Sequence, residues 1–485
     1  DCLLSRGLGD VYKRQLYDKV SAALKSLELD IPIYSFDKLD GVKHIDELKA
    51  LGESISDDEV QTFKDKVSAD DLMTLIYTSG TTGEPKGVMI SHNNILADAY
   101  SIEPIIPLDK DSRSLSFLPL CHVFARSMAS IYMLKGTSIY YAESMETIGE
   151  NLKEVKPHFF VTVPRLLEKV YDKIYAKGAA FTGLKKKMFF WALDLGQRYE
   201  INEEQGWWYN FQLKIANKLI FSKWREALGG EVRLIITGGA AMQQRLIRVF
   251  SAGQIAIREG YGLTEVPIVS CNRPNPKETK IGTVGPIFDC LEVKISEGSG
   301  EILVKGAPVM QGYYNKPEKT AEAIIDGWFH TGDVGTYEDG YLKITGRTKE
   351  IFKTSGGKYI APAALENKLK ESKVIEQAMV IGENRKFPAV LLVPNFDGLK
   401  HWCKIKRITY TTNEEMLMLP DIINKFQKEC DIYNEGFANY EKVKKFGLLA
   451  KEWTVESGEL TPTMKGKRKV ILANNEQLIN EMYDC

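Results

Sequence analysis

Three short apolar runs in this chain each end in a glycine-bearing loop, and this arrangement restricts the fold more than any other feature. Leu72–Tyr77 is followed by a loop of glycine, threonine and serine, and Val232–Ile236 is followed by Thr237-Gly238-Gly239. Ile255–Ile257 precedes a third turn, Gly260-Tyr261-Gly262. Strands that end in glycine loops and lead into helices indicate open α/β sheets, whose ligands bind beyond the carboxyl ends of the strands. The predicted fold class is therefore α/β.

A change of pattern near residue 345 predicts two domains. Leu291–Ile295 and Glu301–Lys305 alternate with period two, which predicts an antiparallel β module at the end of the first domain. Beyond it, a short helix is expected at Ala363–Lys370, followed by apolar runs at Ala378–Ile381 and Ala389–Val393. We therefore expect a large domain over residues 16–345 and a smaller α+β domain over residues 346–485. Residues 1–15 show neither a signal-peptide pattern nor a clear helical period, and our hypothesis is that they are a non-native leader.

Composition excludes several classes of protein. A length of 485 residues suggests roughly three domains. The 64 Lys and Arg residues balance 65 Asp and Glu residues, so the chain is not a generally basic nucleic-acid binder. No apolar stretch is long enough to predict a membrane-spanning helix. The seven cysteines include no CxxC pair, and an odd count without close pairs favours reduced thiols in a cytoplasmic protein.

The segment Tyr77–Gly87, YTSGTTGEPKG, contains the clearest candidate for a phosphate site. A loop of hydroxyl residues and glycines lets backbone N–H groups approach an anion while the hydroxyls donate to it. Lys86 would add a positive charge. The alternative is a polar surface turn, which is the more frequent origin of such a cluster. The loop is not a Walker A motif, because Pro85 stands where that motif requires glycine.

Four later motifs are ambiguous when each is taken alone. In YGLTE, residues 261–265, Tyr261 offers a ring to a base, Thr264 a hydroxyl to a phosphate, and Glu265 an oxygen ligand to Mg²⁺; the alternative is a simple turn. In WFHTGD, Asp333 would accept hydrogen bonds from ribose hydroxyls or else cap a loop. GRTKE, residues 346–350, reads as a charged linker, and residues 460–469 read as a solvated basic tail.

The order of these motifs resembles the adenylate-forming superfamily of acyl-CoA synthetases, aryl-CoA ligases and luciferases. YTSGTTGEPKG, YGLTE, GWFHTGD and GRTKE match that superfamily nearly letter for letter, over about four-fifths of the chain. Within it, the segments LPLCHVFAR at residues 118–126 and SGGKYIAP at residues 355–362 look like those of long-chain fatty acid–CoA ligases. The superfamily has a longer stretch before its phosphate loop, so we expect the large domain to be incomplete at its start.

The resemblance implies a reaction in two halves that uses ATP, Mg²⁺ and coenzyme A. A fatty carboxylate first attacks the α-phosphate of ATP, and the thiol of coenzyme A then displaces AMP. Two unit charges about 4 Å apart repel by about 4 kcal/mol at an effective dielectric constant of 20, so cationic and hydrogen-bonding groups are needed around the phosphates. The implied nucleotide and phosphate contacts come from Thr78, Ser79, Gly80, Thr81, Thr82, Gly83, Lys86, Gly238, Gly239, Ala240, Tyr261, Gly262, Thr264, Glu265, Asp333 and Arg347.

The remaining implied roles concern the second domain and the acyl group. Lys465 would bridge the carboxylate and phosphate, although Lys467 lies close enough in sequence to be the alternative. Lys349 would be the pivot of a hinge that exchanges the groups presented to the adenylate. Gly356 and Gly357 would lie beside the pantetheine arm. His122 would border the acyl and adenylate site, or else be a packed structural histidine.

Several alternatives stay open. The enzyme could act on medium-chain or aromatic acids, or load a carrier-protein thiol, and a non-catalytic adenylate- or acyl-binding protein is a third reading. Four tryptophans in the segment Phe181–Gly230 favour either core helices or an amphipathic surface that touches a bilayer. The expected location is the cytoplasm, with peripheral contact at the inner face of a membrane as the alternative. The sequence leaves the oligomeric state open.

Overall fold

The structure of this chain is a computed structural model that describes residues 2–78, 85–460 and 466–484, with side chains for all of these except 2–13 and 401. Contacts divide the chain into two compact units, Asp1–Asp71 and Leu72–Cys485. The domain boundaries expected at residues 15/16 and 345/346 stay predictions.

The first unit is largely helical. It contains α1 (Cys2–Ser26), a parallel pair formed by β1 (Tyr34–Ser35) and β2 (Lys43–His44), α2 (Ile45–Gly52) and α3 (Asp57–Lys64). His44 and Ser56 begin α2 and α3 with capping boxes, in which the cap and a glutamate three residues later satisfy each other's backbone N–H groups. We found no clear helical period in residues 1–15, but α1 begins at Cys2 and continues past residue 15 to Ser26. Polar and apolar residues mix around this helix, so periodicity could not reveal it.

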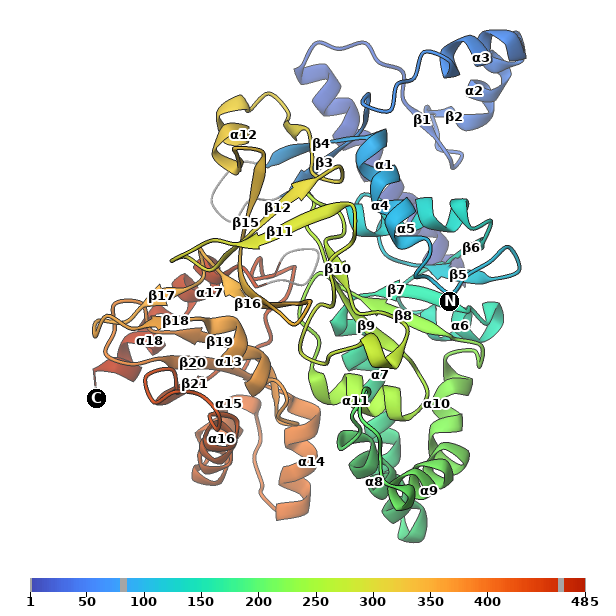
Figure 1. The fold of residues 1–485 in the computed structure, drawn as a ribbon. Helices are drawn as coiled ribbons and strands as arrows, with labels where there is room; N and C mark the ends of the chain where they lie inside the picture. The colour runs from blue at the N-terminus through green and yellow to red at the C-terminus, as the bar shows by residue number, and fades with distance from the viewer. Residues whose placement is uncertain (1, 79–84, 461–465, 485) are drawn as a thin grey trace. The chain divides into compact units, whose positions relative to one another are not determined.

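A six-stranded sheet forms the centre of the second unit (Figure 1). Its order is β10-β9-β8-β7-β5-β6, and all neighbours are parallel except the edge strand β10. Its strands are β5 (Arg113–Ser116), β6 (Ser138–Tyr141), β7 (Phe159–Thr162), β8 (Leu234–Thr237), β9 (Ile257–Tyr261) and β10 (Ser270–Cys271). The open parallel sheet confirms the predicted α/β class. It also corrects one detail: Gly260 and Tyr261 belong to strand β9, and the turn begins at Gly262.

Both faces of this sheet are buried, because alternate side chains of one strand pack into different cores. Phe159 and Val161 of β7 point into one core, which contains residues of α4 (His92–Ile102) and α5 (Val123–Leu134). Phe160, between them, points into the other. The helices with residues in that second core are α6 (Ile148–Val155), α7 (Pro164–Ala179), α8 (Gly183–Gln197), α9 (Trp207–Ala216), the π-helix η1 (Asn217–Phe221), α10 (Ser222–Ala227) and α11 (Gln244–Ala252).

Two antiparallel sheets share a third core. A three-stranded sheet pairs β3 (Leu72–Thr78) with β4 (Lys86–Ser91), and β4 with β13 (Gly312–Tyr313). A five-stranded sheet contains β11 (Leu291–Ile295), β12 (Glu301–Gly306), β14 (Ile324–Ile325), β15 (Trp328–Glu338) and β16 (Tyr341–Arg347). The short helices η2 (Pro276–Glu278) and α12 (Pro317–Ala323) lie between these strands in sequence. The predicted antiparallel β module is therefore confirmed.

Strand β3 contradicts one expectation. We expected its apolar run to belong to the open α/β sheet, but it forms an antiparallel hairpin with β4 outside that sheet. The sequence of a short apolar strand does not determine which strand it pairs with. Here β3 pairs with β4, the next strand in the chain. As a result, Thr78 and Lys86, at the two ends of the phosphate-loop motif, pair directly across the hairpin.

The carboxy-terminal part is an α+β domain around the order β19-β20-β21. Its elements are β17 (Phe352–Lys353), β18 (Tyr359–Ile360), α13 (Pro362–Leu369), β19 (Ile375–Ile381), β20 (Ala389–Pro394), α14 (Phe396–Lys406), α15 (Asn413–Met418), α16 (Pro420–Tyr433), β21 (Lys445–Leu448), α17 (Arg468–Asn474) and α18 (Glu476–Tyr483). Val390 and Leu392 of β20 pack into one core, and Ala389 and Leu391 pack into the core on the opposite face. The predicted helix and the two predicted strands of this part lie where we expected them.

Within the described residues, every helix is too short or too polar to span a bilayer. The described cysteine side chains, which exclude those at positions 2 and 485, are all free thiols: Cys121, Cys271, Cys290, Cys403 and Cys430.

Candidate active site

Three of the predicted site residues form one hydrogen-bonded cluster. The Tyr261 hydroxyl donates to Oδ2 of Asp333 over 2.7 Å, and Nε of Arg347 lies 2.9 Å from Oδ1 of the same carboxylate. The Asp333 residue is only 3% exposed, whereas the Arg347 side chain is 45% exposed. Burial and the neighbouring Asp333 charge raise the pKa of Tyr261 well above its ordinary value, so the phenol keeps its proton and acts as a donor.

The cluster joins the parallel sheet to the five-stranded sheet. Tyr261 is the last residue of β9, and Asp333 and Arg347 are directly opposite each other in the antiparallel pair β15–β16. Thr331 fixes the backbone before Asp333, because its Oγ1 donates to the Ile302 carbonyl over 2.7 Å and lies 3.0 Å from the Asp333 N–H. The register of the β15–β16 pair therefore positions Asp333 and Arg347 relative to each other.

A second cluster surrounds Glu265. The Tyr313 hydroxyl donates to Oε1 of Glu265 over 2.8 Å, and the Met310 N–H donates to the Glu265 carbonyl over 2.8 Å. Nζ of Lys86 lies 3.8 Å from the centroid of the Tyr313 ring, a close cation–π contact. Burial lowers the pKa of Lys86, and the Lys349 charge lowers it further, while Glu265 raises it. Lys86, Glu265 and Lys349 are therefore near enough for their charges to interact.

The turn that carries Thr264 and Glu265 is folded tightly on itself. The Leu263 N–H donates to the Val266 carbonyl over 2.8 Å, and a Cβ added to Gly262 would lie 2.0 Å from the Pro267 carbonyl oxygen. Only glycine fits there, because the obstructing atom belongs to the backbone and cannot move aside. The glycine of YGLTE is thus required by the shape of the turn.

The end of β8 is less crowded than this turn. A Cβ on Gly238 would lie 3.3 Å from the Gly260 carbonyl oxygen and 3.5 Å from the Phe124 ring. Gly239 has a φ of +80° and open space around it, and both it and Ala240 are exposed. The ends of β8 and β9 therefore lie side by side, with Gly238 buried between Gly260 and Phe124.

A buried carboxyl group on β9 was not anticipated. Oε1 of Glu259, on β9, accepts a hydrogen bond from the Met242 N–H over 3.0 Å. Burial raises the pKa of Glu259 to about 7. This side chain joins β9 to the segment between β8 and α11, next to Gly239 and Ala240.

The other predicted residues that the structure describes are exposed or half-buried. His122 is exposed at the N-cap of α5 and makes no side-chain capping hydrogen bond. Thr264 is half-buried in its turn. Gly356 and Gly357 lie in the exposed turn between β17 and β18, where Gly357 has a φ of +81°. Lys349 is exposed two residues after β16 ends.

Some predicted residues cannot be placed. Ser79, Gly80, Thr81, Thr82, Gly83 and Lys465 lie outside the described residues. Lys467 is described; it is exposed, and its N–H donates to the Glu459 carbonyl over 2.7 Å.

Sequence reasoning missed three residues of the site. Tyr313 contacts both Glu265 and Lys86, Phe124 packs beside Gly238, and Glu259 supports the backbone at Met242. Phe124 lies two residues after His122 in the LPLCHVFAR segment, so that segment could have indicated it. Glu259 directly precedes Gly260 but has no pattern of its own, and Tyr313 belongs to a distant part of the chain.

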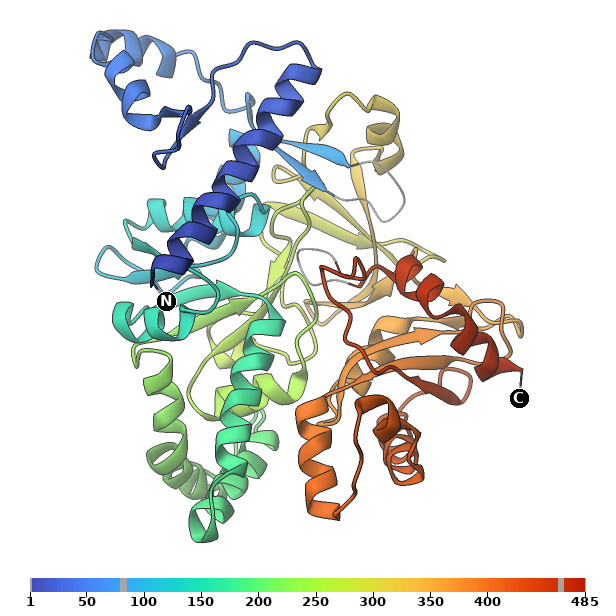
Figure 2. The same cartoon turned by 180° about the vertical axis from the view of Figure 1, so that it is seen from behind.

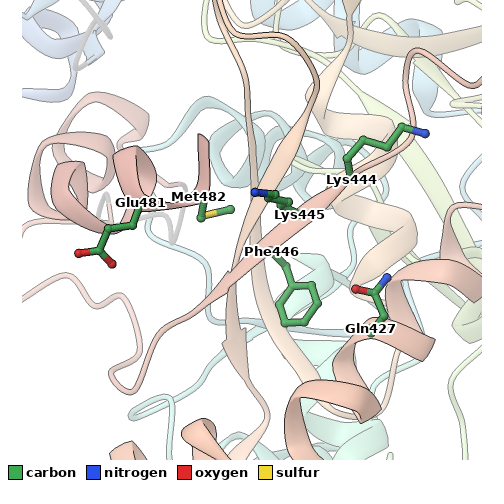
Figure 3. Close-up of a pocket in the computed structure, with 6 residues that line it drawn as sticks. All are labelled: Gln427, Lys444, Lys445, Phe446, Glu481 and Met482. Carbon is green, nitrogen blue, oxygen red and sulfur yellow. The ribbon is translucent and has the colours of Figure 1, made fainter. Parts of the chain in front are cut away.

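A separate hollow of about 310 Å³ lies in the carboxy-terminal domain (Figure 3). The residues that line it come from α16, from β21 with the residue before it, and from α18: Gln427, Lys444, Lys445, Phe446, Glu481 and Met482. None of the predicted site residues lines this hollow, so it does not support a role for the hollow in binding the nucleotide or the acid.

Comparison with known families identifies the fold that holds these clusters. The AMP-binding enzyme family matches residues 17–314, which is more than half of the chain, and the AMP-binding enzyme C-terminal domain matches residues 349–485. The chain belongs to the AMP-binding enzyme family. The resemblance inferred from the motifs is therefore confirmed.

Relatives of this AMP-binding enzyme include long-chain-fatty-acid–CoA ligases. It is 34% identical over 452 residues to the ligase FadD15 of Mycobacterium bovis, a match that covers 92% of this chain and 74% of that protein. It is 35% identical over 436 residues to long-chain-fatty-acid–CoA ligase 1 of Homo sapiens, covering 85% of this chain and 61% of the human protein. The chain thus spans about three-fifths of the human relative. The family and these relatives place it among the acid–CoA ligases that form adenylates.

Solved structures share its fold. The adenylation domain of a carboxylate reductase from Mycobacterium chelonae aligns with a TM-score of 0.69 at 22% identity, covering 97% of this chain and 67% of that one. O-succinylbenzoate coenzyme A synthetase from Bacillus subtilis, in complex with AMP, aligns with a TM-score of 0.59 at 20% identity, covering 83% and 69%. The α/β large domain followed by a smaller domain is therefore the adenylate-forming fold.

Proposed function

We propose that this AMP-binding enzyme uses ATP and Mg²⁺ to join a long-chain fatty acid to coenzyme A. A carboxylate oxygen of the acid attacks the α-phosphorus of ATP, and the bond to pyrophosphate breaks. The sulfur of coenzyme A, having lost its proton, then attacks the acyl carbonyl carbon, and the bond to AMP breaks. The observation that carries the proposal is the buried Asp333 carboxylate held between Tyr261 and Arg347.

The nucleoside half of ATP would bind at the ends of β8 and β9. Each oxygen of Asp333 accepts one contact from the protein, and a carboxylate oxygen has a second lone pair that can accept from a ribose hydroxyl. Arg347 would assist Asp333 in holding the ribose. The ring of Tyr261 and the backbone of Gly238, Gly239 and Ala240 would line the adenine.

The phosphates and the metal would bind near Glu265. Mg²⁺ is usually held by one or two carboxylates together with substrate phosphates. Among the described residues, no group of three acidic, histidine or cysteine side chains could hold a metal ion by itself, whereas Glu265 is a single carboxylate oriented by Tyr313. These residues fit a metal ion that arrives with the triphosphate, and that ion would offset the repulsion between the two anions. Thr264, Lys86 and the loop from Thr78 to Gly83 would contact the phosphate oxygens.

The carboxy-terminal domain, residues 346–485, would exchange groups at the adenylate. Lys465 would contact the carboxylate and the α-phosphate during the first half-reaction. A rotation at Lys349 would then bring Gly356 and Gly357 beside the pantetheine arm. His122, at the start of α5, would border the acyl group.

The fatty acid is proposed from the relatives, whose printed names specify long-chain fatty acids at 34–35% identity. A second candidate is an aromatic acid, which the likeness to O-succinylbenzoate coenzyme A synthetase favours on fold alone. Carboxylate-dependent exchange between ATP and pyrophosphate, measured with medium-chain, long-chain and aromatic acids, separates the two. Exchange that rises with aromatic acids and not with fatty acids would replace the first candidate by the second.

The same assay tests the lysine assignment. Lys465→Ala should slow the exchange by at least ~10²-fold, as loss of one donor to the transition state does. Lys467→Ala is the matched control and should change the rate little. Wild-type exchange in Lys465→Ala, or an equal loss in both variants, would contradict the role given to Lys465.

A further inference from the structure

Helices α8 and α9 form an antiparallel hairpin in the second unit (Figure 1). The Tyr209 hydroxyl donates to the Leu195 carbonyl over 2.6 Å, and Nε1 of Trp191 donates to Oε1 of Gln212 over 3.2 Å. Leu195 of α8 pairs with Tyr209 of α9, and Trp191, one turn earlier in α8, pairs with Gln212, one turn later in α9. The two helices therefore run antiparallel. Figure 2 shows the same two helices side by side from behind.

One face of α9 and the π-helix that follows is a stripe of exposed apolar side chains. The stripe consists of Trp207, Trp208, Phe211, Ile215 and Leu219. Trp207 is 79% exposed and Trp208 is 56% exposed, and Trp208 stacks on Phe211 with ring centroids 5.7 Å apart. Spacings of four residues place Trp207, Phe211, Ile215 and Leu219 along the same side of a helix.

The stripe belongs to a well-anchored helix. The opposite face contributes Ala216 and Phe221 to the core, and both are fully buried. Nδ2 of Asn217 donates to the Ala252 carbonyl over 2.8 Å, which ties η1 to the end of α11. The exposed aromatic rings are therefore held outward by a fixed backbone rather than exposed by a loose end.

Lysines border this stripe at one end of the hairpin. Lys214 and Lys218 are exposed between the apolar positions. Within the described residues, neither lysine forms an ion pair. The register of the hairpin places Lys185–Lys187, at the start of α8, level with residues 217–219. Exposed acidic residues, Glu203 and Glu204, precede α9 at the other end. The positive charge is thus concentrated beside Phe211, Ile215 and Leu219.

We propose that this stripe and its lysines dock on the surface of a bilayer that contains anionic lipid. Indole rings prefer the interface between water and hydrocarbon, and lysines can keep their ammonium groups at the headgroups while their stems lie on apolar surface. Each lysine near an anionic surface adds to the attraction. The proposal concerns the binding surface only, so it does not depend on which acid the enzyme uses.

The size of the stripe favours a bilayer over a second copy of the chain. Aromatic side chains offer about 150–250 Å² each, so five partly exposed apolar side chains present roughly 500 Å². A stable protein interface buries about 800 Å² on each partner. A parallel approach of two copies by this face would also bring lysines of like charge together.

Cosedimentation with vesicles tests the proposal. The full chain is mixed with vesicles of phosphatidylcholine, with or without phosphatidylglycerol, at low and high salt. We expect binding to the anionic vesicles that weakens with salt, because screening acts on exposed charges. The double variants Trp207→Ser/Trp208→Ser and Lys214→Glu/Lys218→Glu should each weaken that binding by at least ~10-fold.

A matched control removes exposed apolar side chains elsewhere. Ile405 and Met418, which are 64% and 71% exposed in the carboxy-terminal domain, are replaced together by serine, and binding should not change. All three double variants should unfold at the wild-type temperature, since the replaced side chains are exposed. The proposal is overturned if the wild type stays in the supernatant, or if the tryptophan variant binds as well as the wild type. It is also overturned if light scattering shows a dimer that this variant dissociates, because the face would then join two copies.

Discussion

Replacing Asp333 by asparagine tests the nucleotide site at its centre. The substitution keeps the shape of the side chain and one oxygen that can accept from Tyr261. It removes the negative charge that pairs with Arg347 over 2.9 Å and that we propose the ribose hydroxyls recognise. The change therefore separates the charge of residue 333 from its packing.

The expected magnitudes follow from burial. The ion pair with Arg347 is exposed on one side, since 45% of the arginine side chain is accessible, so its loss should cost about 1 kcal/mol of stability. Charge-assisted hydrogen bonds are roughly twice as strong as neutral ones. Two weakened ribose contacts should therefore cost about 2 kcal/mol of binding, or ~30-fold in the dissociation constant of AMP.

Calorimetric titration with AMP and urea unfolding measure the two effects separately. Tyr261→Phe is the control, because it removes one donor to Asp333 and keeps the ring; it should weaken AMP binding less than Asp333→Asn does. The reasoning fails if Asp333→Asn binds AMP within about threefold of the wild type. It also fails if the tyrosine variant loses more affinity than the aspartate variant.

Three other predictions concern buried charge, turn shape and the hinge. Burial raises the pKa of Glu259 from 4.5 to about 7, so the folded state holds its proton longer than the unfolded chain does. The contribution of Glu259 to stability should therefore fall by about 3 kcal/mol from pH 4.5 to 7. Glu259→Gln should make urea midpoints less dependent on pH than those of the wild type, and an unchanged pH dependence would contradict the assignment. Gly262→Ala should cut ATP–pyrophosphate exchange at least ~10-fold, because its Cβ meets the Pro267 carbonyl, whereas Gly149→Ala, with open space, should not. Lys349→Pro should impair thioester formation more than exchange, and equal losses would argue against a pivot there.

Much of the fold could be predicted because local patterns agreed with the final sheets. The segments at β11 and β12 alternate with period two, the runs at β8, β19 and β20 are short and apolar, and each of the five became a strand. The two exceptions have different causes. Nothing within the β3 run shows that β4 would capture it, and mixed polarity hides the helical period of α1.

The candidate site divides in the same way. Tyr261, Asp333 and Arg347 could be named from their motifs, and sheet register brings them together. Tyr313 could not, because its contact with Glu265 joins positions 48 residues apart and depends on β13 pairing with β4. Its only local signal was a glycine followed by two tyrosines, which many turns contain.

The end of strand β16 has a consequence for how the enzyme would time its two steps. Arg347 faces Asp333 at the last pair of β15 and β16, and the Thr348 N–H then donates to the Gly332 carbonyl over 2.8 Å, just before Asp333. Lys349 follows immediately. A backbone rotation at Lys349 would therefore strain a hydrogen bond adjacent to the residue that we expect to hold the ribose. Nucleotide binding and the orientation of the carboxy-terminal domain would then be energetically linked through Arg347, Thr348 and Lys349, which are consecutive in the chain.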